Sequence, residues 1–116
     1  MHNFKELKVW QKSRILVKDV YLISKSFPKD EQFGITSQIR RAVISVSNNI
    51  AEGSGRNTKG KFKQFLVMAY GSALELGNLL ILCLDLEMIQ ELKFNNLHNL
   101  NNRNRKDDIC FNENAL

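Results

Sequence analysis

The sequence of 116 residues has little of what marks fibrous, disordered or disulfide-rich proteins. It contains one proline, six glycines and two cysteines, and aromatic residues fill only 9% of its positions. So little proline and glycine excludes a collagen-like or low-complexity chain, and a hydrophobic share of 43% argues against disorder over the whole length. The length fits one domain with a single core, which we predict to span residues 1–116.

Long hydrophobic runs are also missing. The longest uninterrupted apolar runs are residues 65–70 and 79–84, six residues each, whereas a membrane-spanning helix needs about 20. The start, MHNFKELKVWQKSR, has no apolar stretch typical of a secretory signal. Cys83, a predicted core thiol, and Cys110 make no zinc-ligand spacing with the two histidines. We therefore expect a cytoplasmic protein with no membrane partner, no metal and no cofactor.

Charge is distributed unevenly along the chain. The net formal charge is +5, but residues 1–65 carry thirteen basic and five acidic side chains, whereas residues 66–116 carry four basic and seven acidic ones. A basic half is typical of a protein with a polyanionic partner, although it does not identify that partner.

Apolar residues recur at three- and four-residue spacing, which predicts an all-α bundle. The first helix lies within residues 4–27 and is expected to end at Phe27-Pro28. The second has Thr36 or Ser37 as its N-cap and ends at residues 53–55, where glycine can adopt a left-handed C-cap. Thr58 is expected to cap the third, whose apolar stripe continues to Cys83.

A fourth helix is predicted to begin near Gln90 and to lose its apolar face after Leu100. From residue 94 onward, eight of 23 residues are asparagine, which is a poor helix former within a helix. The helical core is therefore expected to cover residues 4–89, and an atypical tail residues 101–116.

Three segments of the sequence resemble a known family. FKELKVWQKS, SQIRRAVISVSNNIAEGSGR and FLVMAYGSALEL look like the small bacterial four-helix-bundle proteins encoded in intervening sequences of 23S ribosomal RNA genes. The resemblance implies an up-and-down four-helix bundle, a homopentameric ring and no known enzymatic activity. The chain also resembles the accessory protein of diversity-generating retroelements, a pentamer that engages a reverse transcriptase and nucleic acid. The motif residues are Trp10, Gln38, Asn49, Glu52, Gly53, Gly71, Ser72 and Glu75.

The tail departs from the family's amphipathic last helix. Suppose that Leu100 is encoded by TTA and that one extra A follows this codon. Codons allowed for residues 101–116, when read without that A, can then encode ITEIEKMIYALMKTL, which has helical apolar spacing. We hypothesise that the tail is a frameshift product. The hypothesis fails if the codons after Leu100 do not permit the alternative frame.

Six basic residues form the candidate nucleic-acid-binding set. Four of them lie at or just after the Gly53-Ser54-Gly55 loop, where backbone amides of the next helix can also bind phosphate. A helix precedes this loop and it lacks the Gly-Lys-Ser/Thr ending, so it is not a P-loop. A solvated helix face would explain the cluster equally well, but repetition around a ring would make it a multivalent polyanion site. The six residues are Arg40, Arg41, Arg56, Lys59, Lys61 and Lys63.

Two glutamates, Glu52 and Glu75, raise the alternative of acid–base or di-metal chemistry. That di-metal site needs a histidine three positions after a glutamate, and the sequence has none. We instead expect Glu75 to be partly buried and paired with Arg40 or Arg41. The sequence therefore predicts no enzyme.

Two aromatic residues and one asparagine have alternative roles. Trp10 and Tyr21 could stack on RNA bases, but their place on the first apolar stripe favours the core. Asn49 is expected to make a buried hydrogen bond or to lie in an interface.

The sequence thus predicts a non-enzymatic oligomeric bundle that associates with RNA or other nucleic acid by neutralising phosphates without reading bases. The alternative is a scaffold for a protein partner that does not bind nucleic acid. Binding to phosphates weakens steeply with salt, whereas binding in an apolar helix groove does not.

Overall fold

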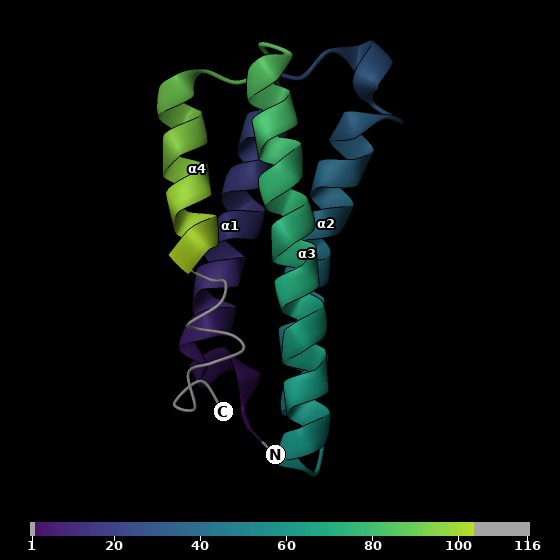
Figure 1. Ribbon diagram of the computed structural model, residues 1–116, viewed down its shortest axis with the longest axis vertical. Helices are drawn as coiled ribbons and strands as arrows, with labels where there is room; N and C mark the ends of the chain where they lie inside the picture. The colour runs from purple at the N-terminus through teal and green to yellow at the C-terminus, as the bar shows by residue number, and fades with distance from the viewer. Residues whose placement is uncertain (1, 104–116) are drawn as a thin grey trace.

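The computed structural model describes residues 2–103, which fold into four α-helices joined by short connections (Figure 1). Consecutive helices run antiparallel, so the predicted up-and-down four-helix bundle is confirmed. The predicted fourth helix begins at Glu91, close to the expected Gln90. The elements are η1 (Phe4–Glu6), α1 (Lys8–Ser24), η2 (Lys29–Glu31), α2 (Ile35–Ser54), α3 (Lys59–Asp85) and α4 (Glu91–Arg103).

The ends of α2 differ from the sequence prediction. Gly34 is the N-cap in place of Thr36 or Ser37, and the Thr36 side chain is buried instead of capping the helix. At the other end Gly55 is right-handed, with φ −83° and ψ −2°, so the expected left-handed C-cap is wrong. The amides of Gly55 and Arg56 instead bond to the carbonyls of Glu52 and Gly53 in a tight last turn.

The two ends of α3 are fixed by different devices. The predicted cap is confirmed at the start, where the Thr58 hydroxyl accepts a hydrogen bond from the Lys61 amide at 3.2 Å. At the end Glu87 adopts the left-handed conformation with φ 57°, and the Met88 amide bonds to the Cys83 carbonyl at 2.9 Å. This is a Schellman-type ending in which a glutamate takes the usual place of glycine.

The interior consists of two clusters of apolar side chains stacked along the long axis. The upper cluster contains Leu16, Val20, Ile39, Leu76, Leu80 and Cys83. Burial raises the pKa of the Cys83 thiol to about 11, so the predicted core thiol is confirmed and stays protonated at neutral pH. Cys110 lies outside the described residues. The lower cluster contains Val9, Val46, Ile50, Phe62, Leu66, Ala69 and Ala73.

Within residues 2–103, helix α4 packs against the upper cluster alone. It buries Leu97, and the next side chain buried on the same face is Asn101. The Asn101 Nδ2 donates to the Ala73 carbonyl at 2.9 Å, while its Oδ1 has no hydrogen-bond partner within residues 2–103. The predicted loss of the apolar face after Leu100 is therefore confirmed at this position. The hypothesised frameshift product lies largely outside the described residues.

Helix α3 is more apolar than its place in the bundle requires. By length and composition alone it could span a membrane, a criterion that core helices of soluble proteins also meet. Less than half of its most apolar window is buried, and five of its large apolar residues are exposed. The two six-residue apolar runs in the sequence belong to one longer apolar stretch. Small residues, Asn78 and one glutamate interrupt this stretch, so counting uninterrupted runs underestimates how apolar the helix is.

Candidate nucleic-acid interface

Four of the six predicted nucleic-acid-binding residues gather at the lower end of the bundle, where α2 turns into α3 (Figure 1). All four side chains are exposed. The helices place them there because α2 ends at Ser54 and α3 begins at Lys59, so the turn and first helical residues project from the end. We call this set the basic end: Arg56, Lys59, Lys61 and Lys63.

Two further contacts define the surroundings of the basic end. The Arg56 guanidinium lies over the Phe65 ring, 4.6 Å from its centroid, which holds the arginine against the start of α3. Element η1 also contacts α2 and brings exposed Lys5, which is not among the six predicted residues, to the same end. The signal that pointed to it was the basic excess of residues 1–65.

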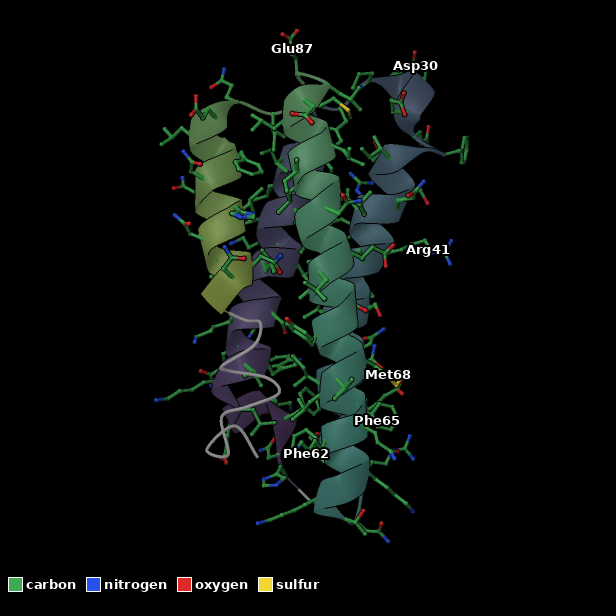
Figure 2. All side chains as sticks on the ribbon, viewed as in Figure 1. Asp30, Arg41, Phe62, Phe65, Met68 and Glu87 are labelled. Carbon is green, nitrogen blue, oxygen red and sulfur yellow. The ribbon has the colours of Figure 1, made fainter. Side chains whose placement is uncertain are left out.

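The opposite end of the bundle has a different electrostatic character. Asp30 and Glu87 lie there (Figure 2), together with the nearby acidic side chains of Glu31, Asp85 and Glu91. Lys29 and Lys93 belong to the same end, so its charge is mixed. The two ends of the molecule's longest axis therefore differ in charge.

Arg40 and Arg41 do not belong to the basic end. They lie on α2 about 20 Å before its end at Ser54, at 1.5 Å per residue. Arg41 is exposed and points away from the bundle (Figure 2). Arg40 is half-buried: its Nε donates to the Ser24 hydroxyl at 2.8 Å, and its guanidinium lies 4.8 Å from the centroid of the Tyr21 ring.

The predicted ion pair of Glu75 is wrong. Glu75 is exposed, and no ion pair joins it to Arg40 or Arg41 within residues 2–103. One residue turns an α-helix by about 100°, which takes Glu75 out of the core-facing row that contains Leu76. Glu75 instead lines a surface groove of about 440 Å³ with exposed Gln38 and Arg41.

The two aromatic residues of the first stripe have different environments. Trp10 is half-buried against the lower cluster and meets the Phe4 ring edge-on at a centroid distance of 5.0 Å, so its core position is confirmed. The core position predicted for Tyr21 is wrong, because 37% of it is exposed. Tyr21 lies at the border of the stripe, one residue after buried Val20.

Three motif residues, Asn49, Gly53 and Ser72, lie near the contact between α2 and α3. The hydroxyls of Ser45 and Ser72 are hydrogen-bonded at 2.7 Å across the helix pair, and the Asn49 Nδ2 donates to the Ser45 carbonyl at 2.9 Å. Asn49 therefore makes the part-buried hydrogen bond that was one of its two predicted roles. Gly53 is buried where the two helices approach closely, since a Cβ added there would lie 2.6 Å from the Cβ of Phe65.

A second surface groove, of about 420 Å³, follows the outer side of α2. Exposed Asn48 and Glu52 line it, and Tyr21 of α1 borders one end. Within residues 2–103, no group of three or more His, Cys, Asp or Glu side chains is arranged to hold a metal ion. The complete lining is Tyr21, Arg40, Arg41, Ile44, Ser45, Asn48, Asn49 and Glu52.

The fold and its basic end define a small up-and-down helical bundle with a polyanion-compatible surface. Residues 5–107 match the family of 23S rRNA-intervening sequence proteins, and the chain belongs to this family. A similar solved structure is a protein of unknown function from the S23 ribosomal protein family of Bacteroides thetaiotaomicron, determined at 1.70 Å resolution. It has a TM-score of 0.77 and 23% identity, covering 83% of this chain and 90% of that one, which supports the fold. No curated protein matches the chain.

Proposed function

We propose that this protein is a non-enzymatic RNA-associated bundle that holds RNA phosphates at its basic end. The gathering of four exposed cations at one helix–helix turn carries the proposal. Within residues 2–103 none of the four forms an ion pair, so each is available to a phosphate. Contacts of this kind position a protein on RNA without reading its bases.

The salt dependence of RNA binding tests the proposal. With four phosphate contacts, the logarithm of the binding constant for a labelled RNA hairpin should fall with the logarithm of salt concentration at a slope of about −3. Replacing Lys59, Lys61 and Lys63 by glutamate should abolish most of the affinity and flatten the slope. Fluorescence anisotropy over a series of salt concentrations measures both quantities.

The matched control reverses three charges at the other end, with Lys25→Glu, Lys29→Glu and Lys93→Glu. It changes the net charge equally but should leave most of the affinity in place, because these lysines are far from the basic end. Equal losses in the two triple variants would show that net charge alone attracts the RNA. No binding at low salt would favour the protein-interaction scaffold.

We also propose that the protein is a homo-oligomer, a pentamer by resemblance, in which the surplus apolar surface of α3 is covered. Val67, Leu74 and Ile81 recur every seven residues along α3 and are 52%, 43% and 43% exposed. A heptad row of this kind is typical of a helix that packs against another helix. Met68, Leu82 and Leu86 extend the apolar surface beside it.

Sedimentation velocity tests the assembly. The double variant Leu74→Glu, Ile81→Glu should dissociate into protomers, because burying two unpaired carboxylates in the interface is costly. Ile15→Glu with Leu22→Glu is the matched control, since both α1 residues are 53% exposed and lie outside the row. A monomeric wild-type protein, or dissociation of both variants alike, would contradict the proposal. A protein partner other than a second copy remains the alternative occupant.

A further inference from the structure

The groove along α2 has contacts that phosphate binding does not need. We propose that it is a binding site for unpaired RNA bases, with the stacked side chains of Tyr21 and Arg40 as its platform. The inference rests on the proposed function and adds to it a preference for single-stranded over double-stranded RNA.

The platform is held in place before any ligand arrives. The Arg40 Nε donates to the buried Ser24 hydroxyl at 2.8 Å, and its guanidinium lies over the Tyr21 ring at 4.8 Å from the centroid. The Ser24 hydroxyl in turn donates to the Tyr21 carbonyl at 3.2 Å. A flexible arginine is thereby fixed by two partners, which lowers the entropy cost of binding a ligand to it.

The outer part of the platform is open to a ligand. Only the Nε of Arg40 is hydrogen-bonded, so within residues 2–103 its two terminal nitrogens have no acceptor. Guanidinium planes stack on unpaired bases as aromatic rings do. The free N–H groups of such a plane can also pair with acceptor atoms on a neighbouring base edge or phosphate.

The rest of the groove suits bases better than phosphates alone. Ile44 and Asn48 follow Arg40 at four-residue spacing, so an apolar side chain and an exposed amide continue the same row over about 12 Å. The amide can both donate to and accept from a base edge. Glu52 closes the lower end, where it repels phosphate but can accept hydrogen bonds from a base amino group.

The position of the groove on α2 links it to the basic end. Arg41 is exposed beside the platform, where it can neutralise a phosphate of the same strand. The helix continues from Arg40 to its last residue, Ser54, over about 21 Å, and Arg56 follows in the turn. A single strand can therefore place a base on the platform while its backbone reaches the basic end. The bases of a duplex are stacked inside it and cannot reach the platform.

A comparison of two RNA forms tests the inference. The probes are a fluorescein-labelled eight-nucleotide RNA and the same RNA annealed to its complement, titrated with the full chain at one fixed salt concentration. The wild-type protein should bind the single strand roughly tenfold more tightly than the duplex. Arg40→Lys, which keeps the charge but loses the plane, and Tyr21→Leu should each reduce this ratio to about one without changing duplex affinity.

One control and one further test variant make the result specific. Arg14→Lys changes another arginine that lies over an aromatic ring, 5.7 Å from the Trp10 centroid, and should leave the ratio unchanged. Asn48→Ala removes an exposed side chain from the groove without disturbing the packing, and should lower the ratio in a protein of wild-type helicity.

The outcomes separate this inference from the proposed function. An unchanged ratio in Arg40→Lys, Tyr21→Leu and Asn48→Ala would overturn the base site while leaving phosphate binding intact. The variant with Lys59, Lys61 and Lys63 replaced should bind the single strand and the duplex more weakly by the same factor. That result would support phosphate binding at the basic end. No binding of either RNA at low salt would overturn both ideas.

Discussion

Replacing Gly53 by alanine is expected to lower the free energy of unfolding by about 1–3 kcal/mol. The new Cβ would lie 2.6 Å from the Cβ of Phe65 and 2.9 Å from Cδ1 of Phe62. The Phe65 Cβ is attached to the backbone, so no rotamer change relieves the clash, and α2 and α3 must move apart. Thermal denaturation followed by circular dichroism measures the loss, at about 4–8 °C per kcal/mol.

Gly71→Ala is the matched control for this substitution. Gly71 lies in the interior of α3, is exposed, and an added Cβ meets no atom within 4 Å. Because alanine is the better helix former, this variant should gain about 0.5–1 kcal/mol. If Gly53→Ala and Gly71→Ala shifted the melting temperature in the same direction, this would contradict the argument that the close approach of α2 and α3 requires glycine at position 53.

Phe62→Ala is expected to have the largest effect, a loss of about 3–5 kcal/mol. Phe62 is 1% exposed and belongs to the lower cluster, whose described members come from α1, α2 and α3 alone. Its ring also meets the His2 ring at a centroid distance of 5.2 Å. Truncation leaves a cavity among α1, α2 and α3 at the lower end of the bundle. Urea denaturation measures the free energy, with the slope as a check on two-state unfolding.

Phe33→Ala removes the same ring from a site that is 91% exposed and should change stability by less than about 0.5 kcal/mol. Comparable losses in the two variants would contradict the assignment of the lower cluster. Combining Gly53→Ala with Phe62→Ala should cost less than the sum of the two, because one of the two clashes disappears with the ring.

The helices could be predicted from the sequence because each core-facing row keeps its three- and four-residue steps for several turns. The ends of the helices were harder. Thr36 has the residue type of an N-cap, but tertiary packing buries it and gives the cap to Gly34. Glu87 shows the opposite case, since its left-handed conformation is set by the return of the chain toward α4 and no glycine marks it.

The candidate site was predicted unevenly for a related reason. Residues of the basic end are neighbours in sequence, so a local count of charges found them. The contact of Arg40 with Tyr21 joins two helices through residues nineteen positions apart, and periodicity says only that Tyr21 is near the border of a stripe. The prediction that Glu75 is partly buried was wrong for the same reason, because a shift of one residue along a helix separates a core-facing position from an exposed one.

The charge difference between the ends of the bundle would give an assembly of protomers that all point the same way two unlike faces. The exposed apolar row of α3 runs along the helix, so protomers joined through it with parallel axes would bring all basic ends to one face. Such a ring would recruit RNA on that face only. At saturation the number of RNA molecules bound would then be counted per ring and not per chain. Several rings bound to one long RNA would all turn the same face toward it.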